Sequence, residues 1–562
     1  MSSVPPTSAS PPARRLPMAG VLRPGRPSDI WFKPALSVVA AVAPPDLTLL
    51  ALGRLDLAMY AMAGALCALY THNRPYAARA AALLWVVLGM LGGLAAALVT
   101  ASLTGSAVVL VTVGALLAAA QKALCDATRV GPPGNVVLTF VSSAALFVPQ
   151  SLDRVPGQLA LAAATGAWAW LVCMAPALLR PHGPERRATA SALRAAAAYA
   201  DTGGTGEGHA AARAAGYAAV QAAWQSLLST RAPSRTRRAL ERLVVRAEVA
   251  LAAPADADAA RLRSWARTLR STGPVPHTAL PPAAADELLG AEADPTLGAE
   301  PSRSLRARLG PLTPLAARTA LGCALAGYVS LALGIGRPYW ALVTAAALYQ
   351  VNIALTWNRA VQRVVGNVVG VLVFAAVVPL AHLGGAALVL CCVAFAFGAE
   401  ALISRNYWLG SVCVTPMALL ITEFAGRQRP GELMTERVVD TVVGALVGFA
   451  AALAVTDRRA GDRVEQALTA ADRAREHAAR LLADSHPGAA ALEAARRRLA
   501  VALAELRATA DAAAGEWWQR ALPQERVVLA EQSGHRTLAA TARRQGLLPD
   551  RGPDTETEDA RP

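Results

Sequence analysis

Two arginines one helical turn apart are the strongest candidates for chemistry in this sequence. Arg359 and Arg363 are four residues apart, and the amide side chains of Asn358 and Gln362 accompany them. Residues at this spacing share one face of a helix, and a guanidinium group presents paired N–H donors that match a carboxylate. The pattern therefore predicts a site for an organic anion at the cytoplasmic mouth of an apolar helix. A pair of topological anchors is the alternative.

Other side chains in the same part of the chain could complete such a site. Gln350 lies upstream of the two arginines, and Tyr339 and Trp340 open an apolar segment. These two rings could stack on an aromatic ligand or belong to an interfacial aromatic belt. Tyr407 and Trp408 open a later segment and have the same two interpretations.

Two acidic residues in apolar segments are candidates for proton coupling. Asp440 lies three residues after Arg437, so these two residues could instead form a structural ion pair. Glu400 ends another apolar segment near Arg405, and extension of its side chain to the membrane surface is the alternative. A carboxylate inside an apolar segment is costly unless it is paired or protonated.

The chain has no pattern typical of a catalytic, metal or cofactor site. It contains no GxSxG, HExxH or P-loop motif, and its eight histidines are scattered. The seven cysteines lie in or beside apolar segments without metal-ligand spacing, which favours packing. The net charge of +15 would suit a nucleic-acid binder, but the arginines do not cluster with aromatic residues on one module. We therefore predict no enzyme, no metal, no cofactor and no nucleic-acid partner.

The distribution of charge divides the chain into apolar and polar blocks. Hydrophobic residues make up 54% of the sequence and charged residues only 17%, against about a quarter in soluble proteins. Residues 34–180 and 312–456 contain few charges, whereas 181–311 and 457–562 are rich in them. This alternation predicts an all-α, polytopic membrane protein whose apolar blocks are solvated by a lipid bilayer.

Each apolar block contains six segments of about the length that crosses a bilayer. The predicted spans are 34–53, 56–71, 79–100, 104–121, 133–150, 156–179, 315–335, 338–354, 362–381, 384–403, 407–424 and 437–456. The pair Pro44-Pro45 should kink or split the first span. An even number of spans returns the chain to one side, where most loop arginines lie. The positive-inside rule therefore predicts an inner-membrane protein with both termini and both polar blocks in the cytoplasm.

The two apolar blocks resemble each other in layout. Arg79 lies 280 positions before Arg359, and Arg154 lies 283 positions before Arg437. Each arginine of the second pair opens the last span of its block. This register predicts two parallel copies of one six-helix bundle.

Helical periodicity in the polar blocks predicts a cytoplasmic helical domain after each bundle. The predicted divisions are a disordered tail at 1–33, a bundle at 34–180, a helical domain at 181–271, a linker at 272–311, a second bundle at 312–456, a second helical domain at 457–545 and a disordered tail at 546–562. Trp517 and Trp518 are expected to dock helices of the second domain on each other, with contact at the membrane interface as the alternative.

Two pairs of glycines predict close helix packing inside the second bundle. Gly366 and Gly370 are four residues apart, as are Gly444 and Gly448. Small residues at this spacing let two membrane helices approach closely. We expect the two glycine faces to pack on each other.

Three motifs in the second block resemble those of one known family. They are the Arg-Pro-Tyr-Trp run at 337–340, the segment at 358–370 with Arg359, Arg363 and Gly366, and the Arg-Val-Val-Asp-Thr-Val-Val-Gly run at 437–444. They resemble the PYW, R-x-x-x-R-x-x-G-T-x-x-G and R-x-x-D-T-x-x-G motifs of the fusaric acid resistance and aromatic acid exporter (FUSC) superfamily. Asn367 stands where the family has threonine, so the position stays polar. The first block has only a weaker counterpart at 72–79.

The resemblance implies an efflux permease, driven by the proton gradient, for small organic acids or other hydrophobic anions. It also allows a homodimer. The alternative is a membrane scaffold whose soluble domains bind partners. The bundle interior distinguishes the two functions, because an exporter needs a cavity reached by Arg359, Arg363 and Gln350. A scaffold would fill that space with leucine, valine and alanine.

Overall fold

The structure is a computed structural model. The residues that it describes are 20–25, 30–128, 130–131, 133–202, 207–229, 234–271, 273–276, 309, 312–350, 352–424, 426, 428–455, 460–485, 488–514 and 523–544. This part of the chain is all-helical and contains no strand. Trp517, Trp518, most of the predicted linker and the tail at 546–562 lie outside the described residues.

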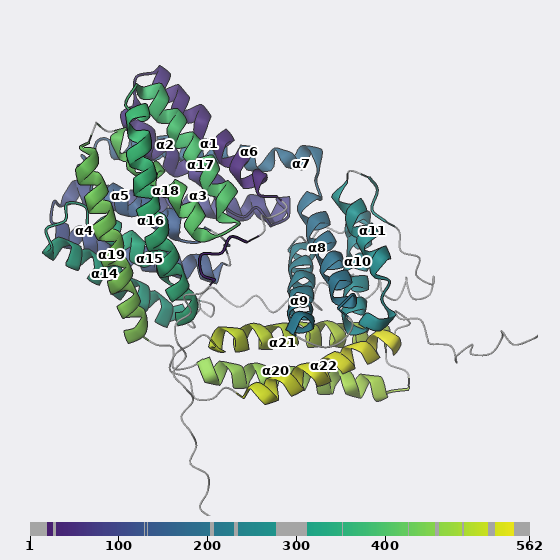
Figure 1. Cartoon of the computed structure of the whole chain (residues 1–562). Helices are drawn as coiled ribbons and strands as arrows, with labels where there is room; N and C mark the ends of the chain where they lie inside the picture. Colours follow the sequence, from purple (N-terminus) through teal and green to yellow (C-terminus); the bar gives the residue numbers. More distant parts are fainter. Residues whose placement is uncertain are drawn as a thin grey trace, which may run out of the picture.

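The first apolar block forms the helices that are purple to blue in Figure 1. They are α1 (Phe32–Ala51), η1 (Leu55–Leu57), α2 (Ala58–Ala65), η2 (Leu66–Leu69), α3 (Tyr76–Leu103), α4 (Ala107–Ala127), α5 (Val136–Leu146), α6 (Val155–Met174) and α7 (Pro176–Leu179). The second apolar block forms α14 (Thr313–Ala332), α15 (Tyr339–Leu348), α16 (Ile353–Ala381), α17 (Gly385–Ile403), α18 (Tyr407–Glu423) and α19 (Pro430–Ala454).

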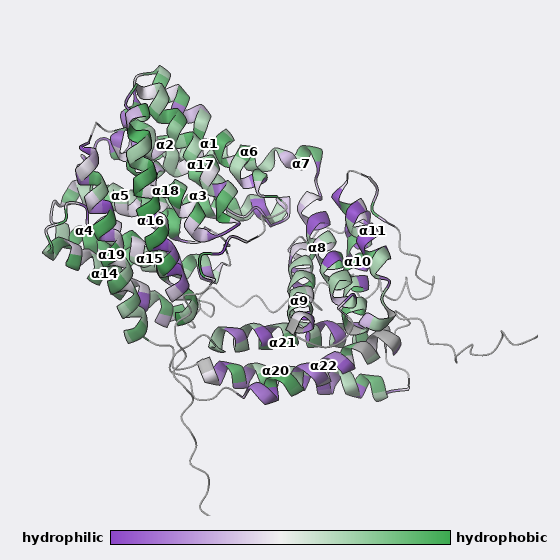
Figure 2. Ribbon diagram, in the orientation of Figure 1, coloured by the Kyte–Doolittle hydropathy of each residue, from purple (hydrophilic) through white to green (hydrophobic). Residues whose placement is uncertain are grey.

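Each of the twelve predicted spans overlaps a helix in these two blocks. Among the described residues, eight helices are long and apolar enough to cross a membrane, which makes the chain a polytopic membrane protein. The other four are shorter: Leu55–Leu69, Val136–Leu146, Tyr339–Leu348 and Tyr407–Glu423. These occupy the second and fifth positions of each block. The helices of this bundle are predominantly hydrophobic in Figure 2. Large apolar side chains on them face outward, among them Leu372 and Leu446, which are 65% and 68% exposed.

The proline pair does not split α1, which runs through Pro44 and Pro45 from Phe32 to Ala51. A proline has no backbone N–H, so Pro44 leaves the carbonyl of Ala40 without its helical donor. The indole Nε1 of Trp168 on α6 donates to this carbonyl at 3.0 Å. A neighbouring helix thus replaces the missing hydrogen bond, which is how membrane helices tolerate proline.

The two halves of the bundle interlock through the first and fourth of their six segments. Helix α1 packs on α17, and α14 packs on α4, so the first segment of each half lies against the fourth segment of the other. Both pairs can be followed in Figure 1. The short helix α15 also contacts α5, and α18 contacts α2. These matched pairings support an internal repeat, and the duplication itself stays a prediction.

The polar blocks form helices of mixed hydropathy beside the bundle (Figure 2). They are α8 (Gly183–Ala200), α9 (Glu207–Leu228), α10 (Arg235–Ala252), η3 (Pro254–Asp256), α11 (Ala259–Arg270), α20 (Ala460–Ala483), α21 (Ala489–Ala514) and α22 (Gln524–Arg544). Helices α8 to α11 share one hydrophobic core, and α20 to α22 share another. Because α10 packs on α22 and α9 packs on α21, the two groups form one assembly.

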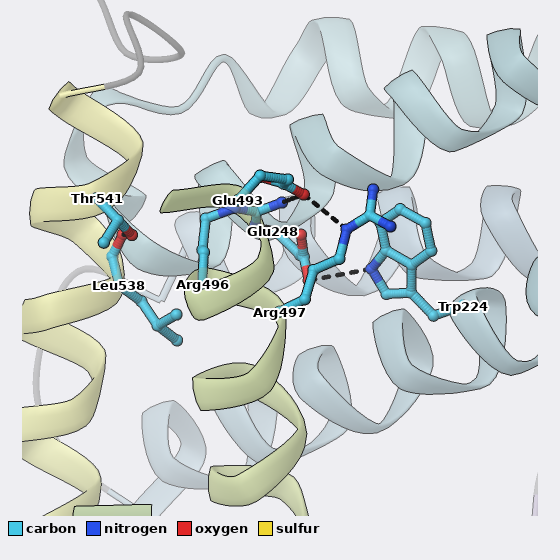
Figure 3. Close-up of polar contacts among 7 residues, drawn as sticks. All are labelled: Trp224, Glu248, Glu493, Arg496, Arg497, Leu538 and Thr541. Carbon is cyan, nitrogen blue, oxygen red and sulfur yellow. Dashed lines mark hydrogen bonds and ion pairs between the residues drawn. The ribbon is translucent and has the colours of Figure 1, made fainter. Parts of the chain in front are cut away.

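A buried ionic network joins the two groups of helices from the polar blocks (Figure 3). We call these two groups, α8 to α11 and α20 to α22, the soluble helices. Arg496 on α21 binds Glu493 through two hydrogen bonds of 2.8 and 2.7 Å, and it also binds Glu248 on α10. Arg497 donates to Glu493 at 2.7 Å and lies over the ring of Trp224 on α9. Burial alone would raise the pKa of Glu493, but the charges of Arg496 and Arg497 outweigh it and lower this pKa to about 2.

Part of the predicted disordered N-terminal tail has a defined position in the structure. Residues 20–25 lie against the beginning of α18, where the indole of Trp408 donates to the Leu22 carbonyl at 3.0 Å. The amides of Gln362 and Asn406 both donate to the Val21 carbonyl. The prediction of disorder is therefore wrong for these six residues, because bundle side chains satisfy their backbone groups.

Candidate anion-binding site

The predicted arginine pair lies within a helix rather than at its entrance. Helix α16 begins at Ile353, where the side chain of Asn352 accepts a hydrogen bond from the Leu355 amide at 2.8 Å and caps the helix. At a rise of about 1.5 Å per residue, Arg359 and Arg363 lie roughly 9 and 15 Å along it. The apolar sequence alone had placed the start of this span about nine residues too late.

Both arginines converge on one tyrosine of α18. The guanidinium carbon of Arg359 lies 3.9 Å from the ring centre of Tyr407, and Nη1 of Arg363 donates to the Tyr407 hydroxyl at 2.9 Å. Arg363 is buried, and its Nε has no hydrogen-bond partner. Within the described part of the chain, neither arginine forms an ion pair. Two cations without a carboxylate therefore face the space beside Tyr407.

A third arginine continues this group into the bundle. Arg437 on α19 is 1% exposed, and its guanidinium carbon lies 4.0 Å from the ring centre of Trp340. Its Nε and Nη1 have no hydrogen-bond partner. Arg437 interacts electrostatically with Arg363, which in turn interacts with Arg359. The three side chains thus form a line of positive charge, which we call the arginine line.

The predicted ion pair between Arg437 and Asp440 is wrong. No salt bridge joins their charged groups in the described structure, since Arg437 lies on Trp340 instead. Asp440 is fully buried, and its Oδ1 accepts a hydrogen bond from the Ser330 hydroxyl at 2.6 Å. Its Oδ2 has no partner. A buried carboxylate with one free oxygen is costly in its charged form.

Trp340 and Tyr339 do not belong to an aromatic belt. They are 1% and 6% exposed, and their rings pack on Phe140 and Phe147 of α5. Neither ring lines the large cavity into which Arg359 and Arg363 project. The ring of Trp340 instead packs on the guanidinium group of Arg437 in a cation–π contact.

A large cavity connects the arginine line to the soluble helices. Its volume is about 3190 Å³, and its walls include Gln350, Asn358, Gln362 and Glu400 together with the arginine line. On the soluble side its walls come mainly from α8, α9 and α21, with a few residues of α10, α11 and α22. A pocket for one small ligand typically measures about 300–1,000 Å³, so this space is a vestibule as well as a pocket.

The vestibule is strongly positive. Among the described residues that line it, fourteen are arginine or lysine and four are aspartate or glutamate. Some of these cations are neutralised, as Lys122 is by Asp126 at 3.1 Å. The remaining excess of positive charge favours an anion, because walls of one sign raise the local concentration of the opposite charge.

The two glycine pairs face the short helices rather than each other. A Cβ on Gly366 would lie 2.6 Å from Cβ of Ser411 on α18, and one on Gly370 would meet Cβ of Thr415 at 2.7 Å. A Cβ on Gly444 would lie 2.4 Å from the Ala341 carbonyl oxygen of α15. Gly448 also packs on α15. The expectation that the two glycine faces meet is therefore wrong.

Asn367, the departure from the family pattern, lies between α16 and α18. Its amide donates to the Arg363 carbonyl at 2.8 Å, and its Oδ1 accepts from the Thr415 hydroxyl at 2.9 Å. Thr415 comes from the short helix α18. The polar group at this position therefore helps fix the helix that carries Tyr407.

From the sequence, neither Tyr407 nor Arg437 could be placed next to Arg359 and Arg363. Both open a predicted span. The first interpretation was an interfacial ring for Tyr407 and an ion pair with Asp440 for Arg437. The signal for Arg437 was its position beside Asp440 near the start of an apolar run. A pattern in one dimension does not show that the side chain turns inward to a ring 97 residues away.

Comparisons with known proteins find a match in the second apolar block. Residues 324–451 match the family described as fusaric acid resistance protein-like. The "Uncharacterized membrane protein YvaC" of Bacillus subtilis (strain 168) is 36% identical over 122 residues, which are 21% of this chain and 19% of that protein. The alignment thus spans about a fifth of each protein, and no solved structure matches the chain. This chain is a membrane protein whose residues 324–451 are similar to the fusaric acid resistance protein-like family, as its motifs predicted.

Proposed function

We propose that this protein is a secondary exporter of small organic anions, among them aromatic carboxylates. The observation that carries the proposal is the cavity lined by Arg359, Arg363 and Gln350. Arg363 and Arg437 are buried in this region without a carboxylate partner among the described residues. A buried guanidinium group costs free energy unless an anion neutralises it. A carboxylate on the cargo would supply that charge.

The arginine line supports an inward path for the cargo. Arg363 lies within electrostatic reach of both the half-buried Arg359 and the fully buried Arg437. A carboxylate could exchange from one guanidinium to the next without losing its counter-charge. The apolar and aromatic remainder of the cargo would contact Tyr407, Met417 and Val414, which also line the cavity.

In the proposed orientation the protein lies in the inner membrane. Its soluble helices and both termini are in the cytoplasm. Positively charged loop residues favour that side. The cavity opens toward the soluble helices, so in this orientation the vestibule collects anions from the cytoplasm. A homodimer is compatible with the proposal and is not required by it.

The alternative function, a membrane scaffold, is less well supported by the bundle interior. A scaffold would fill the space around Arg359, Arg363 and Gln350 with aliphatic side chains. The walls there contain arginines, amides, Tyr407 and Glu400. The soluble assembly could still bind partners, but the polar interior favours transport.

Replacing Arg363 with alanine should abolish export. The change removes a buried cation and its 2.9 Å bond to Tyr407, and losing one charge-assisted contact lowers affinity by about tenfold or more. The measurement is accumulation of radiolabelled aromatic acids, from a panel that includes benzoates, in cells that overproduce the protein. Arg429→Ala is the matched control, because Arg429 is 84% exposed and pairs with Glu432, which is exposed too. If cells with the Arg363 variant accumulated the labelled acids to the same level as cells with the wild-type protein, at equal protein level, the proposed role of Arg363 would be wrong.

Replacing Asp440 with asparagine should uncouple transport from the proton gradient. We propose that Asp440 binds the coupling proton, because it is fully buried and its Oδ2 is unpartnered. Asparagine resembles the protonated carboxyl and keeps an acceptor for Ser330. In proteoliposomes, the variant should exchange labelled cargo but gain no acceleration from an imposed pH gradient. Gradient-driven transport at the wild-type rate would assign coupling to Glu400 instead, with Glu400→Gln as the companion variant.

A further inference from the structure

A second group of cations lies outside the arginine line, at the end of the first half of the bundle that faces the soluble helices. It consists of Lys33 on α1, Arg79 on α3, Arg180 after α7 and Arg187 on α8. We propose that these four residues, the phosphate cluster, bind the phosphate of an anionic phospholipid headgroup. Lys33, Arg180 and Arg187 also line the vestibule, but the inference does not require that the vestibule carry a cargo.

Lys33, Arg180 and Arg187 line the same cavity, and each of the four cations lies within electrostatic reach of at least two others. Lys33 interacts unfavourably with Arg187, Arg180 and Arg79, and Arg187 interacts in the same way with Arg79 and Arg180. Glu185 is the one carboxylate of the described residues that acts on Arg187. It also lies 3.8 Å from His182. Four cations with one shared carboxylate leave the cluster with a net positive charge.

Two of the arginines have unused donors that are buried. Arg79 is 5% exposed, its Nη2 bonds the neutral ring of His72 at 3.0 Å, and its Nε has no partner. Arg187 donates through Nε to the Gly183 carbonyl at 3.2 Å, and its Nη1 is buried without a partner. Buried donors without acceptors are costly. A phosphate group, with several acceptor oxygens and a negative charge, would satisfy them.

The surroundings of the cluster favour a lipid over a free phosphate. Trp31 and Phe32, directly before Lys33, are 38% and 42% exposed. Leu178 and Leu179, directly before Arg180, are 88% and 87% exposed. Such apolar side chains beside cations match the acyl chains and headgroup of one phospholipid. Basic pockets between membrane helices bind anionic headgroups in this way.

The test is lipid-dependent stabilisation of the full chain, purified in detergent. Its thermal unfolding midpoint is titrated with dioctanoyl phosphatidylglycerol, dioctanoyl phosphatidylcholine and inorganic phosphate at constant ionic strength. We expect a saturable rise with phosphatidylglycerol alone. Arg187→Gln should raise the half-saturating concentration by about tenfold, the expected cost of one charge-assisted contact. Lys122→Gln, which removes a vestibule cation already paired with Asp126, should leave it unchanged.

Each other outcome overturns part of the proposal or all of it. An equal response to inorganic phosphate would overturn the lipid assignment and identify a free phosphoryl anion as the ligand. Equal half-saturation in wild type and Arg187→Gln, or no response in wild type, would overturn the site. If Arg187→Gln does not fold, Lys33→Gln gives the same measurement, and Lys33→Arg should retain wild-type binding because it keeps the charge.

Discussion

Arg437→Gln should reduce transport of organic anions by about tenfold to a hundredfold while the protein remains folded. Arg437 ends the arginine line, and its Nε and Nη1 have no partner in the described structure. Hydrogen bonds between charged groups contribute about 1.5–3 kcal/mol, and each 1.4 kcal/mol is a factor of ten. If the cargo carboxylate binds Arg437 at the innermost point of its path, glutamine removes that contact entirely.

The stability of the same variant separates a transport role from a structural one. A buried guanidinium group loses several kcal/mol of solvation, and the cation–π contact with Trp340 returns only about 2 kcal/mol. A residue kept for structure would be expected to have an ion-pair partner. We therefore expect Arg437→Gln to unfold at the same temperature as wild type or a higher one.

The measurement pairs initial rates in proteoliposomes with thermal unfolding of the same preparation. Arg437→Lys keeps the charge but loses the planar fork and its stacking on Trp340, so it should recover only part of the rate. Arg429→Ala, at the exposed beginning of α19, should match wild type in both assays. A lower unfolding temperature together with lost transport would assign Arg437 to packing instead.

The number and class of helices could be predicted because lipid imposes a simple rule. A chain segment in hydrocarbon must satisfy its backbone internally, so apolar runs become helices of limited length. The four short helices were less predictable as structures. Tyr339–Leu348 is fully enclosed by other helices, and hydropathy does not distinguish burial in protein from burial in lipid.

The composition of the site was partly predictable, but its arrangement was not. Arg359 and Arg363 were found from their spacing, because four residues is a local distance along one helix. The residues that complete the site with these two arginines are distant in sequence. Tyr407 comes from α18, Arg437 from α19 and Trp340 from α15. Contacts of this kind depend on how helices pack, which no local pattern specifies.

Removing Arg496 should destabilise the soluble assembly more than any surface change. This side chain is 3% exposed and neutralises both Glu493 and Glu248. Its loss leaves two carboxylates buried without their main cation, a change that costs about 3–5 kcal/mol. Since Glu248 belongs to α10 and Glu493 to α21, the break falls at the contact between the two groups of soluble helices. We expect Arg496→Met to separate these groups at a lower temperature than in wild type.

Thermal unfolding with limited proteolysis of the full chain tests this expectation. Arg526→Ala is the matched control, because Arg526 and Glu465 form an exposed ion pair between α22 and α20, and such pairs contribute about 0.2–1 kcal/mol. Adding Glu248→Gln and Glu493→Gln to Arg496→Met should recover part of the loss, since the two carboxylates that Arg496 neutralised are then uncharged. A midpoint shift in Arg496→Met no larger than in the control would mean that the network does not hold the groups together. Arg496 and Glu248 also line the vestibule, so Arg496→Met should slow transport. The triple variant should recover the transport rate only if the two groups of soluble helices pack together again around the vestibule.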